Sequence, residues 1–150
     1  MEKRVHQSID NFQIGKAIHI IKGKKIALFV TGAIMEEVIK TMEKLHEKEI
    51  YPSLYSFPTI KPIDKETIEE CASKYDRIVT IEEHNIIGGV GSAVAEVMVE
   101  LPDRNARLIK IGINDTYANA VGTQEYLRDY YGISANKIFE KIMNYFDKEK

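Results

Sequence analysis

The sequence predicts an α/β fold: a three-layer α/β/α sandwich on a five-stranded mixed sheet whose first strand is antiparallel to the others. The first observation is segment 77–98, which reads as a buried strand, a glycine turn and an amphipathic helix. The second is the recurrence of such strand–helix units, because right-handed helical crossovers force parallel pairing. The third is the short turn Lys22–Lys25 between two apolar runs, which predicts an antiparallel pair of the flanking strands.

The apolar periods place these elements along the chain. Strands are expected over residues 17–21, 26–30, 50–57, 78–81 and 107–113, the last near an edge of the sheet. Helices are expected from the Thr31–Gly32 cap to about residue 48, from residue 65 behind an Asp64 cap, from about residue 90 to Pro102, from Thr123 to Gly132, and from Ser134 onward. Residues 1–9 carry no period, so we expect a loose arm or a severed linker there and one domain over residues 10–150.

Composition excludes several classes of protein. Charged residues make up 29% of the 150 residues, and the net charge of −2 is spread along the chain, which argues against nucleic acid or anionic membrane as a partner. The most apolar stretch, residues 26–35, is too short to span a bilayer, and no leader follows Met1. The single cysteine, Cys71, excludes an internal disulfide and fits a reducing cytoplasm. We therefore expect a cytoplasmic protein.

The glycines Gly88, Gly89 and Gly91 allow two interpretations. Free N–H groups at a helix start after a strand could cradle a phosphate. However, the spacing does not match G-x-G-x-x-G, and the preceding Glu82 and Glu83 would repel a phosphate. The alternative is a tight turn that lets the strand and the helix pack closely, and we favour it.

Other polar residues are weighed in the same way. Glu82, Glu83 and His84 could supply a general acid and base, or they could form a hydrogen-bonded interface cluster, and alternation along a strand lets at most two of them share a site. No histidine pair has metal-ligand spacing. Asp115 is expected to hold a turn, and Cys71 to be a small core residue. Tyr126, Tyr130 and Tyr131 are expected to pack rather than to stack on a ligand.

Several segments resemble the carboxy-terminal domain of the transketolase family, over about residues 10–146. They are Phe12-x-Ile14-Gly15-Lys16-Ala17, the run from Ile26 to Gly32, Ile60-Lys61-Pro62-Ile63-Asp64, Val79 to His84 with Gly88 to Ser92, Gly112-Ile113-x-Asp115, and Tyr131-Gly132-Ile133. The Pro62-Ile63-Asp64 segment and the Glu82-Glu83-His84 segment with Gly88-Gly89 are also similar to 1-deoxyxylulose 5-phosphate synthase and, more distantly, to the β subunit of 2-oxo-acid dehydrogenases. The branch of the family stays open.

The resemblance implies a thiamine diphosphate and Mg²⁺ enzyme that transfers a two-carbon unit between sugar phosphates. The cofactor motif, Gly-Asp-Gly with a downstream Asn, is not in this sequence, and the family assigns its third domain no chemistry. We therefore expect no catalytic, cofactor-binding or metal-binding residue in this chain, and an inactive chain in isolation. Its expected partners are the missing cofactor-binding domains, in cis or as a separate subunit, within a homo-oligomer such as a dimer. The alternative is a freestanding module that binds an anionic metabolite at the Gly88 loop.

The last expectation concerns the corner formed by Glu82, Glu83, His84, Ile86, Ile87, Gly88, Gly89 and Gly91. Catalysis is disfavoured there and two carboxylates oppose a phosphate, so we interpret the corner as a contact surface. Exposed apolar residues such as Ile86 or Ile87 in a loop usually mark a partner. At least one charge of Glu82, Glu83 or His84 should then be paired, because unpaired burial costs several kcal/mol.

Overall fold

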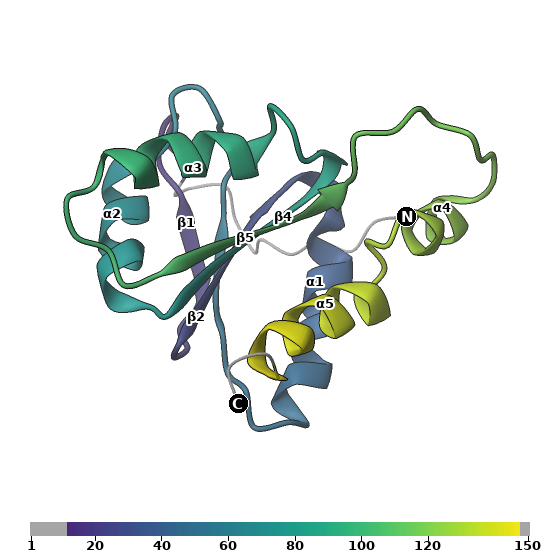
Figure 1. The fold of residues 1–150 in the computed structure, drawn as a ribbon, viewed down its shortest axis with the longest axis horizontal. Coiled ribbons are helices and arrows are strands. Elements are labelled where there is room, and N and C mark those ends of the chain that lie inside the picture. Colours follow the sequence, from purple (N-terminus) through teal and green to yellow (C-terminus); the bar gives the residue numbers. More distant parts are fainter. Residues whose placement is uncertain (1–11, 148–150) are drawn as a thin grey trace.

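The computed structural model describes residues 12–147, so the expected arm at residues 1–9 lies outside the described part. The strands are β1 (Ile18–Ile21), β2 (Ile26–Thr31), β3 (Ser53–Ser56), β4 (Arg77–Asn85) and β5 (Arg107–Ile113). The helices are the 3₁₀ turn η1 (Gly32–Ile34), α1 (Met35–His46), α2 (Lys65–Lys74), α3 (Val90–Glu100), α4 (Gln124–Tyr130) and α5 (Ala135–Asp147). Figure 1 shows α2 and α3 on one face of the sheet and α1 and α5 on the other. The predicted fold class is confirmed.

The five strands lie in the order β1-β3-β2-β4-β5. Strands β2, β3, β4 and β5 are parallel, and β1 is antiparallel to β3. The predicted direction of β1 is therefore correct, but the expected pairing of β1 with β2 is wrong. The turn that follows β1 passes beneath the start of β3, where Lys24 N–H donates to Tyr51 O at 2.7 Å. A Cβ on Gly23 would lie 2.2 Å from that same oxygen, so only glycine allows the close crossing.

Two cores fill the space between the layers. Alternate residues of the central strands point to opposite faces, so Leu28 and Val30 pack against α1 and α5, whereas Ala27 and Phe29 pack against α2 and α3. All of β2 from Ile26 to Val30 is fully buried, as expected for the centre of a parallel sheet. Cys71 lies in the second core, where burial raises the pKa of its thiol to about 11. The prediction that it is a core residue is confirmed.

Helices α2 and α4 each begin behind a side-chain N-cap. The Asp64 carboxylate accepts a hydrogen bond from Thr67 N–H, and the Thr123 hydroxyl accepts one from Tyr126 N–H, so both predicted caps are confirmed. Thr31 makes no side-chain cap, because β2 continues through it and a 3₁₀ turn precedes α1. None of the helices in the described residues is both long and apolar enough to cross a bilayer.

Candidate functional site

Strand β4 is longer than the sequence predicted. We expected it to end at Ile81, but it runs to Asn85, so Glu82, Glu83 and His84 lie within the strand. The pairing with β5 shifts in register between Ile81 and Asn85. Because side chains alternate along a strand, Glu82 and Glu83 point to opposite faces of the sheet and join two separate clusters. Glu82 and Glu83 therefore do not share one cluster, and the contact surface expected at this corner stays a prediction.

Glu82 closes the N-terminus of α3. Its carboxylate is 2% exposed and accepts hydrogen bonds from the N–H groups of Val90 at 2.9 Å and Gly91 at 3.1 Å. These are the donors that a bound phosphate would need at this helix start. The side chain of the protein itself thus occupies the place of an anionic ligand.

Two glycines make this approach possible. A Cβ on Gly89 would lie 1.8 Å from Glu82 Oε2, and a Cβ on Gly91 would lie 2.7 Å from Thr80 Oγ1 and from Lys110 Cδ. Gly88 has a φ of +80°, a left-handed conformation that favours glycine. The glycines therefore let α3 pack tightly on β4 and on the Glu82 carboxylate, which supports the tight-turn interpretation.

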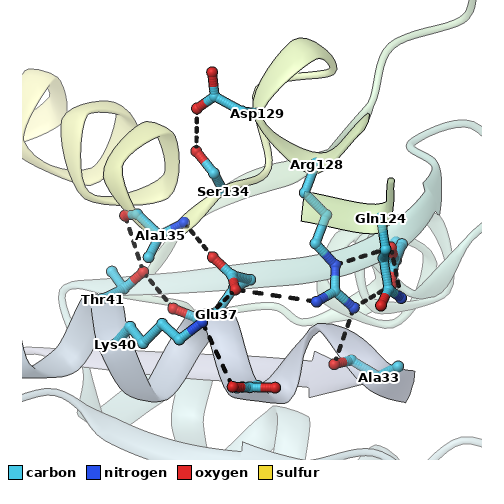
Figure 2. Close-up of polar contacts among 11 residues, drawn as sticks. Ala33, Glu37, Lys40, Thr41, Gln124, Arg128, Asp129, Ser134 and Ala135 are labelled. Carbon is cyan, nitrogen blue, oxygen red and sulfur yellow. Dashed lines mark hydrogen bonds and ion pairs between the residues drawn. The ribbon is translucent and has the colours of Figure 1, made fainter. Parts of the chain in front are cut away.

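Glu83 belongs to the opposite face, where it meets Arg128 of α4. The guanidinium donates from Nε to Glu83 Oε1 at 2.9 Å and from Nη2 to Glu83 Oε2 at 2.7 Å, a bidentate pair. Arg128 Nη2 also donates to the carbonyl of Ala33 at 3.3 Å, and the side chain is buried. Glu83 thus has its charge paired within the domain, whereas the pairing expected in a contact with a partner stays a prediction. Figure 2 shows Arg128 and its contact with Ala33.

Arg128 fills the position at which doubly wound sheets usually bind a ligand. After β2 the chain crosses one face of the sheet through α1 to β3, and after β4 it crosses the other face through α3 to β5. These two connections run in opposite directions from the neighbouring strands β2 and β4, so the sheet has a switch point between the ends of these strands. Ligands commonly enter the crevice at such a switch point. Here the guanidinium bridges Ala33, just after β2, and Glu83, at the end of β4.

A second buried carboxylate, Glu37 of α1, completes this cluster. It accepts hydrogen bonds from Ala135 N–H at the start of α5 at 2.8 Å and from Lys40 Nζ at 2.9 Å, and it lies 4.0 Å from Arg128 Nη1. Burial by itself would raise the pKa of Glu37, but these partners hold it below its ordinary value. The cluster therefore fastens α4 and the start of α5 to α1 and β4 (Figure 2).

The remaining corner residues lie at the surface. His84 is exposed, and its Nδ1 lies 3.0 Å from the carbonyl of Asn85. Ile87 is 61% exposed, whereas Ile86 is half-buried and its N–H donates to Ile113 O at 2.9 Å. Asp115 accepts a hydrogen bond from Asn85 Nδ2 at 3.1 Å, so it ties the end of β4 to the loop after β5. No group of metal-ligating side chains is found among residues 12–147.

A groove next to the corner does not resemble a ligand site. It measures about 500 Å³ and lies between the 60–65 connection and α3. Lys61 and Lys65 are matched there by Glu96 and Glu100, and no buried side-chain polar atom of the described residues lacks a hydrogen-bond partner. Nothing in this groove selects a charged or polar ligand.

Comparison with known proteins gives the same family that the sequence motifs suggest. The family model "Transketolase, C-terminal domain" matches residues 15–138. The chain belongs to the transketolase C-terminal domain family. A putative transketolase C-terminal section of Methanocaldococcus jannaschii is 39% identical over 138 residues, which are 92% of this chain and 42% of that protein. The 1-deoxy-D-xylulose-5-phosphate synthase of Dictyoglomus thermophilum is 30% identical over 94% of this chain and 22% of its own length.

A solved structure, described as a split gene transketolase and an inactive beta4 tetramer, superposes on this transketolase C-terminal domain with a TM-score of 0.85. The two sequences are 28% identical, over 95% of this chain and 46% of that chain. The present chain thus spans less than half the length of each of these relatives. The name of the family says that the part of a transketolase to which this chain corresponds is the C-terminal domain.

Transketolase-family enzymes use thiamine diphosphate with Mg²⁺, but the described residues do not fit this group. The N–H groups at the start of α3 are already bonded to Glu82, and the switch-point crevice already holds Arg128. Sequence reasoning missed Arg128 and Glu37. The sequence signal that could have pointed to Arg128 is its i,i+4 spacing from Gln124, which puts both side chains on one face of the helix. In the structure both of these side chains contact Glu83.

Proposed function

We propose that this chain is the noncatalytic C-terminal domain or small subunit of a thiamine diphosphate-dependent transketolase-type enzyme that transfers a two-carbon unit between sugar phosphates. Its role is assembly and support of the cofactor-binding domains, which are supplied in cis or by a separate polypeptide. The family match and the relatives named as transketolase sections support the enzyme class. A cytoplasmic location fits the single, buried and reduced cysteine.

One observation carries the noncatalytic role: the chain fills its own two ligand positions. Glu82 satisfies the first N–H groups of α3, and Arg128 occupies the crevice between β2 and β4. A ligand would have to displace a buried carboxylate or a buried guanidinium, each of which would lose hydrogen bonds worth several kcal/mol in a dry site. This also disfavours the alternative of a freestanding anion-binding module at the Gly88 loop.

The branch of the family and the assembly are part of the same proposal. A 1-deoxyxylulose 5-phosphate synthase or a 2-oxo-acid dehydrogenase β subunit is the alternative parent enzyme, and the synthase relative supports it. The split-gene relative, described as an inactive beta4 tetramer, supports self-association of a chain of this kind. In either case this chain contributes contacts, and the exposed Ile87 at the corner is a candidate contact residue.

Titration calorimetry tests the noncatalytic role. Thiamine diphosphate with Mg²⁺, injected into the isolated chain, is expected to give no saturable heat, and the isolated chain is expected to show no transketolase activity. Inorganic pyrophosphate serves as a control for simple anion binding at the start of α3, and it too is expected to give no saturable heat. A micromolar dissociation constant for the cofactor would contradict the proposal.

A further inference from the structure

Large apolar side chains are exposed mainly at one edge of the sheet, the edge where the four parallel strands end. Ile87 follows β4, and Tyr117 and Val121 lie in the 114–122 loop after β5, with exposures of 95% and 98%. Tyr126 and Tyr130 project from α4 and are each about half exposed. Figure 1 shows this loop and α4 reaching out from the end of β5. We call these five residues the carboxyl-edge surface.

Apart from Phe12 and Ile14, which precede β1, the other exposed large apolar side chains of the described residues are more dispersed. Tyr51, Val99 and Tyr145 lie before β3, near the end of α3 and near the end of α5, on three separate elements. Single exposed apolar residues are ordinary on a protein surface, whereas a contiguous group of them marks a contact. Tyrosines are also enriched in protein–protein contacts. The asymmetry therefore singles out the carboxyl-edge surface.

This surface is held in place by hydrogen bonds and ring contacts. Asn119 of the loop donates from its N–H to Tyr131 Oη at 3.2 Å and accepts from the Tyr130 hydroxyl at 3.3 Å. The rings of Tyr126 and Tyr130 have centroids 6.0 Å apart. Helix α4 is in turn fastened to β4 by the Arg128–Glu83 pair. The rings of Tyr126 and Tyr130 are therefore presented in a fixed arrangement rather than on a free helix.

The path of the chain indicates what covers this edge. Because β1 is antiparallel, it starts where the parallel strands end, and the residues before it reach the same edge. Gly15 N–H donates to Thr59 Oγ1 at 2.8 Å, and Ala17 N–H donates to Asp64 Oδ2 at 2.9 Å, which fixes this approach beside the connection after β3. Phe12 and Ile14 are exposed there as well. A longer relative that shares this fold and whose matching part is C-terminal would have its preceding polypeptide lead into this edge.

We infer that the carboxyl-edge surface is the docking site for the part of a transketolase-type polypeptide that precedes this domain in longer relatives, present in cis or as a separate subunit. The inference rests on the proposed function and adds the surface through which assembly occurs. The partner contributes an apolar patch with few charges, because the five residues offer aromatic and aliphatic area and hydroxyl groups but no net charge.

A chimera tests this inference. In it, the present chain replaces the matching 42% of the Methanocaldococcus jannaschii relative, so that the preceding part of that relative is the probe. Chymotrypsin cleavage after Tyr117 and Tyr126 is followed by mass spectrometry in the chimera and in the isolated chain. Cleavage is expected to be at least about tenfold slower in the chimera, since docking covers both sites. Equal rates would overturn the inference.

Paired variants show whether protection comes from this surface. Val121→Ser with Tyr126→Ser should return cleavage at Tyr117 in the chimera to within about twofold of the isolated chain. The matched control, Tyr51→Ser with Val99→Ser, also removes one exposed aromatic and one exposed aliphatic side chain, and should leave protection unchanged. Both pairs should leave the melting temperature of the isolated chain unchanged, which excludes unfolding as the cause. Protection that persists in the first pair would overturn the inference.

Two further outcomes separate this inference from the proposed function. If the isolated chain forms a dimer that Val121→Ser with Tyr126→Ser dissociates, a second copy occupies the surface and the inference is wrong. If thiamine diphosphate binds the isolated chain while Tyr117 is protected in the chimera, the noncatalytic role is wrong and the docking surface stands. Size-exclusion chromatography and calorimetry on the same samples distinguish the two.

Discussion

Two buried glutamates cap helices to which they do not belong, and they do so in different ways. Glu82 of β4 accepts hydrogen bonds from the N–H groups of Val90 and Gly91 at the start of α3 and is 2% exposed. Glu37 of α1 accepts from Ala135 N–H at the start of α5 and is also paired with Lys40 and close to Arg128. The hydrogen bonds to Glu82 thus come from backbone N–H groups, whereas Glu37 is held by a backbone N–H group and by cations.

The difference follows from what surrounds each carboxylate. At α3 a single carboxylate meets a helix N-terminus, whose free N–H groups and dipole balance it, provided that Gly89 leaves room for the approach. At α5 two carboxylates, Glu37 and Glu83, converge on one region, and their mutual repulsion requires a cation between them. Glu82 therefore depends on a glycine, whereas the Glu37 cluster depends on Arg128. Each dependence can be broken separately.

The largest effect is expected from Arg128→Met. It removes the cation from two carboxylates while keeping the apolar stem, and an uncompensated buried charge costs about 3–5 kcal/mol. Urea unfolding of the isolated chain measures the loss. Lys137→Met is the control, because Lys137 pairs with Glu140 at the surface and such pairs contribute about 0–1 kcal/mol. A loss below about 1 kcal/mol for Arg128→Met would show that the cluster does not need its cation.

Gly89→Ala is expected to have the next largest effect. Its φ of −88° suits alanine, so the backbone is not strained, and the cost comes from the Cβ that would lie 1.8 Å from Glu82 Oε2. Displacing the carboxylate leaves buried donors unsatisfied, at roughly 2–3 kcal/mol. Glu82→Ala removes the clash, so the double variant should cost clearly less than the sum of the two single variants. Simple additivity in urea unfolding would contradict this explanation.

These two clusters also show what the sequence could predict. The glycine run and the preceding acids predicted a tight turn unsuited to phosphate, because strand, turn and helix are consecutive in the chain. The sequence did not predict that the Glu82 carboxylate itself binds the N–H groups at the start of α3. That prediction would have required knowing that β4 continues past Ile81 and directs the Glu82 side chain toward α3. Strand length depends on pairing with β5, which sequence periodicity does not show.

Arg128 illustrates the opposite case. It lies 45 residues from Glu83 in sequence, and its helix, Gln124–Tyr130, reads as an ordinary polar surface helix. Only the return of the chain over the end of β4 makes this arginine buried. The prediction that β1 pairs with β2 failed for the same reason. The turn at Gly23 can be read from the local sequence, but the position of β3 beside β1 cannot.

A pH titration of stability separates the two glutamates further. The pKa of Glu37 is lowered in the folded chain, so its contribution is present above its ordinary value of 4.5 and is lost as pH falls through the lower folded value. Glu37→Gln should therefore cost roughly 1–2 kcal/mol at pH 7, and the difference from the original chain should shrink below about pH 4.5. Urea unfolding at pH 7, 5 and 4 measures this. A difference that grows as pH falls would reverse the assignment.

The smallest effect is expected from Lys40→Met, which tests which cation Glu37 needs. Lys40 Nζ lies only 2.9 Å from Glu37 Oε1, closer than Arg128 Nη1 at 4.0 Å, but the Lys40 side chain is 47% exposed whereas Arg128 is buried. Water and salt screen an exposed ammonium, so its loss should cost only about 0.5 kcal/mol, and this cost should vanish in 1 M salt. Glu82→Ala should cost the same at low and high salt, because its carboxylate is buried against backbone N–H groups. Urea unfolding of both variants at the two salt concentrations gives the comparison.

Lys40→Met could instead destabilise the chain as much as Arg128→Met. The nearer cation, Lys40, would then stabilise the Glu37 carboxylate although it is exposed, and burial would not explain the importance of Arg128.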